Sequence, residues 1–114
     1  MGNDQWLESV YSDGSRYFVS NPEPKLGERV SVRIRMYEDT PVRHVLVRTC
    51  PSGNQYFSEA GKIKTEHGLA YYEASFVVSE PRMHYHFYLA CDNIIYYYMK
   101  KASAWTFTEG TLRA

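Results

Sequence analysis

The most constraining feature of this sequence is an alternation of apolar and polar side chains with a period of two residues. It is clearest over residues 29–36, where arginine or serine alternates with an apolar residue. The apolar series there consists of Val30, Val32, Ile34 and Met36. Successive side chains of a β-strand point to opposite faces, so this pattern predicts a strand with one buried and one solvent-facing side. Residues 83–91 repeat the pattern.

Short strand-like segments separated by turn residues recur along the whole chain. We expect about eight or nine strands, near residues 6–11, 16–20, 29–36, 42–49, 55–59, 69–79, 83–91, 94–99 and 102–108. Residues 60–68 are polar and predicted to be irregular, and no segment keeps a helical period over three turns. The sequence therefore predicts an all-β fold, built as an antiparallel two-sheet sandwich.

The balance of charge argues against two classes of partner. The chain of 114 residues carries 13 Lys and Arg and 13 Asp and Glu, so its formal net charge is zero. A nucleic-acid-binding domain normally has a basic excess, because its affinity comes from neutralising phosphates. An anionic membrane surface attracts basic segments for the same reason. We therefore expect no nucleic-acid and no membrane partner, and no apolar run reaches the roughly 20 residues of a membrane span.

The cysteines and the N-terminal residues predict a cytoplasmic location. Cys50 and Cys91 are the only cysteines, and no tryptophan lies between them, unlike in the disulfide arrangement of immunoglobulin domains. We expect free, buried thiols, although the sequence leaves open whether the two pair. The N-terminus shows no basic segment followed by an apolar stretch, so no signal peptide is expected.

The sequence offers no recognisable active site, and we expect no catalytic residue and no cofactor. No nucleophile stands beside a base, and no glycine-rich phosphate loop is present. His84 and His86 would share one face of a strand and could share a metal ion, but no spacing fixes a third ligand. Two solvent-facing histidines are the plainer interpretation, so no metal site is predicted.

Aromatic side chains are unusually frequent, at 16% of the chain, and eleven of them are tyrosines. Tyrosine suits half-buried strands, because one end of its side chain is apolar and the other can meet water. Exposed rings could also stack on sugars or pack against a protein. Composition does not decide between these two uses.

Two stretches of the chain resemble a known family. Residues 12–35 contain Asn21-Pro22-Glu23-Pro24-Lys25-Leu26-Gly27-Glu28 before the alternating strand, and residues 85–98 end in three consecutive tyrosines. They resemble the N-terminal immunoglobulin-like domain of neopullulanase, cyclomaltodextrinase and maltogenic amylase enzymes, which is a family 34 carbohydrate-binding module. Residues 42–49 fit the element between them, so the resemblance spans about residues 10–108.

The resemblance implies an immunoglobulin-like sandwich over residues 1–108, with residues 109–114 beginning a linker toward a catalytic barrel. The chain would then be no enzyme by itself but an accessory domain of an α-amylase family glycoside hydrolase, which acts on α-1,4 and α-1,6 glucans. The implied partners are α-glucan oligosaccharides such as starch, pullulan or cyclodextrin pieces, the barrel of the same polypeptide, and a second copy in a homodimer. The alternative is a dimerisation domain that binds no sugar.

Aromatic rings are the candidate sugar-facing residues. We predict Trp6, Tyr96, Tyr98 and Trp105 for this role. The chain departs from the family where the consensus has asparagine after the tyrosines, since Met99 and Lys100 stand there.

Overall fold

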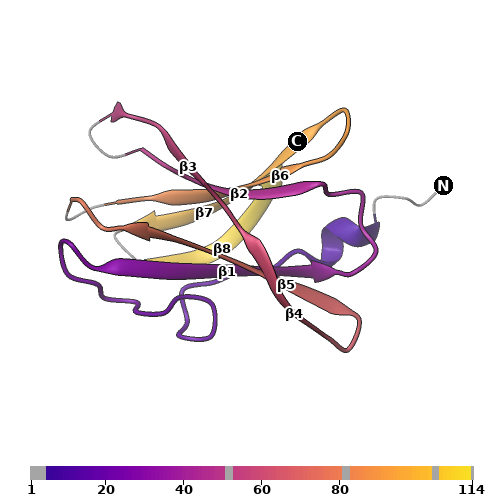
Figure 1. Ribbon diagram of the computed structural model, residues 1–114, viewed down its shortest axis with the longest axis horizontal. Coiled ribbons are helices and arrows are strands. Elements are labelled where there is room, and N and C mark those ends of the chain that lie inside the picture. The colour runs from indigo at the N-terminus through magenta and orange to yellow at the C-terminus, as the bar shows by residue number, and fades with distance from the viewer. Residues whose placement is uncertain (1–4, 51–52, 81–82, 104–105, 114) are drawn as a thin grey trace.

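The computed structural model describes residues 5–50, 53–80, 83–103 and 106–113, and side chains up to residue 98. The described chain forms two antiparallel sheets (Figure 1). The three-stranded sheet consists of β1 (Arg29–Tyr37), β5 (Leu69–Val77) and β4 (Gly61–Glu66), in that order. The five-stranded sheet consists of β3 (Tyr56–Glu59), β2 (His44–Thr49), β6 (Tyr85–Ala90), β7 (Ile95–Ser103) and β8 (Thr106–Arg113). The predicted all-β sandwich is confirmed.

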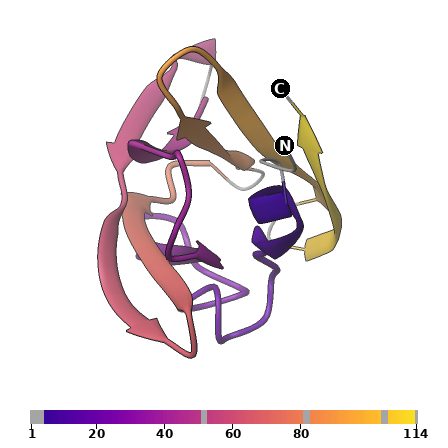
Figure 2. The same ribbon diagram turned by 90° about the vertical axis from the view of Figure 1, so that its right-hand side faces the viewer.

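The core lies between the sheets and is built from the alternating residues that the sequence indicated. The even positions of β1 from Val30 to Met36 are fully buried, whereas the odd positions are partly or fully exposed. β6 contributes Phe87 and Leu89, which are buried to the same degree. Each such side chain contributes about 1.5–3 kcal/mol when removed from water, so the alternation itself drives the two sheets together. Figure 2 shows the two sheets enclosing this space.

The N-terminal residues differ from the prediction of two strands. Residues 6–11 were expected to be a strand, but Gln5–Ser9 form a 3-10 helix, η1. The Ser9 side chain explains the difference, because its hydroxyl donates to the Trp6 carbonyl and accepts from the Tyr37 backbone N–H, 2.8 Å away. A serine that bonds its own backbone favours a local turn over a strand ladder.

The segment 10–20 also forms no continuous strand, although residues 16–20 were predicted to be one. It touches the free edge of β1 through two isolated bridges, Tyr11 to Arg35 and Val19 to Val32. Between the bridges the Asp13 carboxylate accepts the Ser15 N–H, at 2.8 Å, which turns the chain. The segment therefore lies along β1 as a bent cover.

Residues 60–68 were predicted to be irregular, and this prediction is wrong. They form β4 and a tight turn into β5, where His67 and Gly68 have φ values of 54° and 79°. Positive φ at both central residues is typical of a type I′ hairpin turn. β4 is an edge strand with both faces largely exposed, so it has no apolar alternation to reveal it.

β8 pairs with β7 and takes in residues 109–113, which the family resemblance implied to be the start of a linker. Cys50 and Cys91 are both free, as expected, but each is only partly buried.

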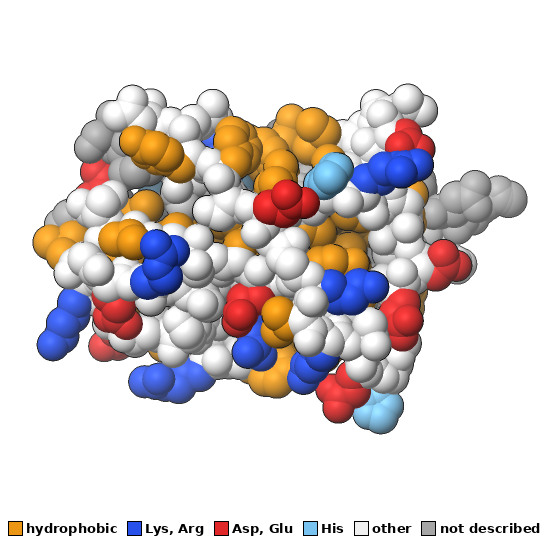
Figure 3. Space-filling model, viewed as in Figure 1, with side chains coloured by type: hydrophobic (Ala, Val, Ile, Leu, Met, Phe, Trp, Pro, Cys, Tyr) orange, Lys and Arg blue, Asp and Glu red, His pale blue; other side chains and the backbone are white. Residues whose placement is uncertain are grey.

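None of the described helical residues form a segment long and apolar enough to cross a bilayer. In the view of Figure 3, acidic and basic side chains are interspersed, in keeping with the zero net charge.

Candidate functional site

Two of the predicted sugar-facing residues lie together, but their rings are mostly covered. Trp6 on η1 is 5% exposed, and its ring meets the half-buried ring of Tyr96 edge to face, with centroids 5.4 Å apart. Stacking on a sugar needs an open ring face, which Trp6 does not offer. Trp105, the fourth predicted residue, lies outside the described residues.

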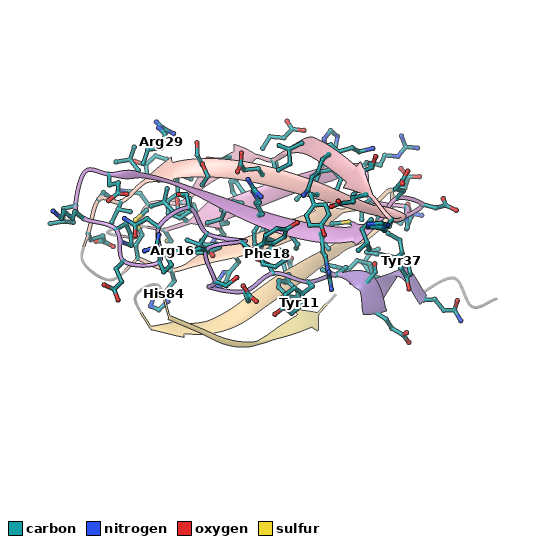
Figure 4. The ribbon with its side chains drawn as sticks, turned by 90° about the horizontal axis from the view of Figure 1, so that it is seen from below. Tyr11, Arg16, Phe18, Arg29, Tyr37 and His84 are labelled. Carbon is teal, nitrogen blue, oxygen red and sulfur yellow. The ribbon has the colours of Figure 1, made fainter. Side chains whose placement is uncertain are left out.

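Tyr98 has a structural position at the side of the sandwich that segment 10–20 closes. Its hydroxyl accepts the Ser12 N–H and donates to the Ser12 carbonyl, both at 3.2 Å. The Ser12 hydroxyl in turn donates to the Arg33 carbonyl, so Tyr98 on β7 is linked through Ser12 to β1. Burial raises the pKa of the Tyr98 hydroxyl above its ordinary value. Figure 4 shows Tyr11 and Phe18 of the same segment beside β1. The ring of Tyr98 is therefore buried in the core and presents no open face to a ligand.

The opposite side of the sandwich is open, and a groove of about 470 Å³ lies there. It runs between β3 and the adjoining ends of β1 and β5. These ends of β1 and β5 lie on the left in Figure 1. Its polar and aromatic lining comprises Arg29, Thr49, Asn54, Tyr56, Ser58, Ser75 and Ser79. The apolar part of the floor is Phe76, Val77 and Met83.

The register of β3 explains why Tyr56 stands in this groove. Tyr56 pairs with Thr49 and Ser58 pairs with Val47, whose side chains are buried on the inner face of the sheet. Tyr56 therefore points to the inner side of the sandwich, yet it is 58% exposed because β3 lies at the edge of its sheet. An inward-pointing aromatic ring is thus left uncovered.

The lining of the groove carries groups that could hold a polar ligand. An exposed ring offers an apolar face, and the surrounding amide, hydroxyl and guanidinium groups can hydrogen-bond hydroxyls of a ligand. Arg29 is already oriented, since its Nη1 donates to the Ser75 hydroxyl at 3.0 Å. The described lining residues include no carboxylate, cysteine or histidine that could act as a nucleophile or base.

The outer face of the five-stranded sheet carries a second set of aromatic side chains, which we call the aromatic row: Phe57, Tyr88 and Tyr97. The ring centroids of Phe57 and Tyr88 are 5.3 Å apart, and those of Tyr88 and Tyr97 are 4.7 Å apart. Tyr97 points outward because Tyr98 pairs with the buried Phe87 and neighbouring residues alternate. Of the three consecutive tyrosines, the middle one therefore reaches the outer surface.

The two histidines singled out in the sequence lie near this row. His84 is exposed, and His86 is half-buried on the outer face of β6 beside Arg48. No group of three or more histidine, cysteine or acidic side chains able to hold a metal ion occurs within the described residues.

The comparisons with known proteins found a similarity in fold. No family model matches the chain, and no curated protein matches it. A solved structure of cyclomaltodextrinase is similar in fold, with a TM-score of 0.69 and 20% sequence identity. The match covers 87% of this chain but only 17% of that one, so this chain is similar in fold to a small part of that enzyme. Cyclomaltodextrinase is one of the enzymes whose N-terminal domain the sequence motifs resemble, and at the level of fold this resemblance is confirmed.

Proposed function

We propose that this chain is a non-catalytic accessory domain of an α-amylase family glycoside hydrolase and that it binds α-glucan in the groove beside Tyr56. The similarity in fold to a part of cyclomaltodextrinase supports the class of parent protein. The observation that carries the binding role is the ring of Tyr56, which points inward but is left uncovered beside several hydroxyl groups. The described lining includes serine hydroxyls but no carboxylate or histidine that could activate them as nucleophiles, which fits an accessory role.

The geometry suggests how a glucose unit would lie in the groove. The apolar C–H face of the sugar ring would stack on Tyr56, while its hydroxyls would exchange hydrogen bonds with Asn54, Ser58 and Arg29. Among the described lining residues, Tyr56 is the one exposed aromatic ring. We therefore expect a dissociation constant on the order of 1 mM, as for other small contact areas with few anchors.

Titration of the domain with maltoheptaose and with β-cyclodextrin tests this proposal. Binding should be saturable by isothermal calorimetry or NMR, and Tyr56→Ala should abolish it. Tyr37→Ala is the matched control, since Tyr37 is 46% exposed but lies at the opposite end of β1 from the groove. An absence of binding up to about 10 mM sugar, or an equal loss in both variants, would overturn the proposal.

The second candidate is a domain that contacts protein rather than sugar, either the catalytic barrel of the same polypeptide or a second copy. The exposed apolar side chains of the five-stranded sheet favour it, since Phe57 is 48% and Ile95 is 43% exposed. Substrate-cleft shaping would then follow from where the domain is docked. The measurement that separates the candidates is the oligomeric state and cyclodextrin preference of the parent enzyme with and without this domain.

A further inference from the structure

A small pocket of about 240 Å³ lies on the outer face of the five-stranded sheet, on the side of β3 away from the glucan groove. It is lined by Arg48, His86, Tyr88 and Tyr97. The register brings these four together, because Arg48 pairs with His86 across β2 and β6, and Tyr88 pairs with Tyr97 across β6 and β7. Side chains directly opposite each other on neighbouring strands share a face.

The charge of Arg48 is not matched by an acid in the part of the chain that the structure describes. Its Nε donates to the amide oxygen of Gln55, which is neutral. Two neighbouring side chains at the start of β2 do have acidic partners: Arg43 is ion-paired with Asp92, and His44 lies 3.1 Å from Glu59. The planar guanidinium group of an arginine can donate two parallel hydrogen bonds to one carboxylate. Arg48 is therefore suited to bind an acidic side chain from another molecule.

His86 reinforces this preference for an anion. Burial lowers the pKa of its imidazole, and the positive charges of Arg48 and His84 lower this pKa further. Apart from Arg48 and His86, the residues that line the pocket are Tyr88 and Tyr97, and neither brings a carboxylate. A carboxylate placed between Arg48 and His86 would offset the repulsion between them and favour the protonated imidazole.

The surroundings of the pocket have the composition of a protein interface. The aromatic row lies beside Arg48, and Phe57 at its end is 48% exposed. Tyrosine, phenylalanine and arginine are enriched at the centres of such interfaces, and charged pairs are typical of the rim. The exposed side chains of His44 and Glu59 lie within hydrogen-bonding distance of each other on this face of the sheet.

We propose that this pocket binds the carboxylate of an aspartate or glutamate side chain on a protein partner, and that apolar side chains next to that residue cover the aromatic row. The proposal is independent of glucan binding, because Phe57 and Tyr56 point to opposite sides of β3. A partner bound here would leave the groove accessible to sugar.

The test uses a short acidic peptide, acetyl-Leu-Glu-Leu-amide, added to the isotope-labelled domain and followed by NMR. Saturable shifts are expected for the side-chain signals of Arg48 and His86, with at least about tenfold weaker binding of the glutamine analogue, acetyl-Leu-Gln-Leu-amide. Because a bound carboxylate favours the imidazolium, affinity for the acidic peptide should rise as the pH falls through the pKa of His86. His86→Gln should remove that rise and keep the binding at neutral pH.

Arg48→Gln should abolish the response to the acidic peptide, whereas Arg16→Gln, at an exposed arginine of segment 10–20, should leave it unchanged. Equal responses to the two peptides, an unchanged response in Arg48→Gln, or no response up to about 20 mM peptide would overturn the proposal. Maltoheptaose should not shift the Arg48 and His86 signals, so failure of this proposal and failure of glucan binding are separate results.

Discussion

The two sides of this sandwich, where the edges of the sheets meet, differ in how they are covered. Next to β1, segment 10–20 fills the gap between the sheets, and Tyr98 holds it there through both backbone groups of Ser12. On the other side, β3 ends its sheet without cover, and Tyr56 points into an open groove. The comparison shows two uses of tyrosine in one small domain. One ring is buried and bonded to the backbone, and the other is exposed in a groove, where we propose that it binds a ligand.

Removing the whole Tyr98 side chain should have the largest effect on stability. Tyr98→Ala deletes a buried aromatic ring, whose loss costs about 4 kcal/mol of the free energy of unfolding. Urea denaturation monitored by circular dichroism measures this change. A loss below about 1 kcal/mol would mean that the closed side does not depend on this ring.

Removing only the hydroxyl isolates the hydrogen bonds that hold segment 10–20. Tyr98→Phe leaves the Ser12 N–H and carbonyl without this partner, and we expect a loss of about 1.5 kcal/mol. Tyr56→Phe removes a hydroxyl from the open side and is the matched control, with an expected change within about 0.5 kcal/mol. Equal losses of stability in the two variants would contradict the difference between the closed side and the open side of the sandwich.

The pH dependence of stability should also report on the closed side. The pKa of Tyr98 is raised in the folded state by burial, so at alkaline pH the unfolded chain releases its proton first. Stability should therefore fall as the pH rises above the ordinary tyrosine pKa of about 10, and Tyr98→Phe should show a smaller fall. Thermal melts from about pH 8 to pH 11 measure both slopes. Below about pH 8 the difference between the two proteins should stay constant. Identical alkaline slopes would contradict the assignment.

Removing the Tyr56 ring from the uncovered side of the sandwich should have the smallest effect on stability. Tyr56→Ala removes a ring that is 58% exposed, and we expect a change of about 0.5 kcal/mol in the free energy of unfolding. The same denaturation experiment checks it. A loss comparable to that of Tyr98→Ala would show that Tyr56 belongs to the core and is not reserved for a ligand.

The sequence predicted the strands whose two faces differ and missed the elements whose faces do not. β1 and β6 were predictable because one face of each is buried, whereas β4 is exposed on both faces and carries no alternation. In segment 10–20, Ser12 and Asp13 use their side chains to satisfy the backbone, an arrangement that strand patterns do not contain.

The predicted sugar-facing residues were chosen without knowing the register. Within the three consecutive tyrosines, the pairing of Tyr98 with Phe87 decides which rings face inward, and that pairing is a long-range property. Tyr56 was missed for a related reason. Its exposure depends on how far the opposing sheet extends, which no local pattern around it records. Alternation relative to a known core strand was the one signal that could have selected Tyr97 as the outward-facing ring.

Mapping the maltoheptaose site residue by residue tests the central claim most directly. In ¹H–¹⁵N and aromatic ¹H–¹³C spectra, we predict saturable shifts for Tyr56, Ser58, Ser75 and Val77, with a dissociation constant on the order of 1 mM. Signals of the aromatic row and of Ser12 at the closed side should not move. Shifts centred on Tyr96 or on the outer face, or no shifts up to about 10 mM sugar, would contradict the claim that the open side of this sandwich is a glucan-binding groove.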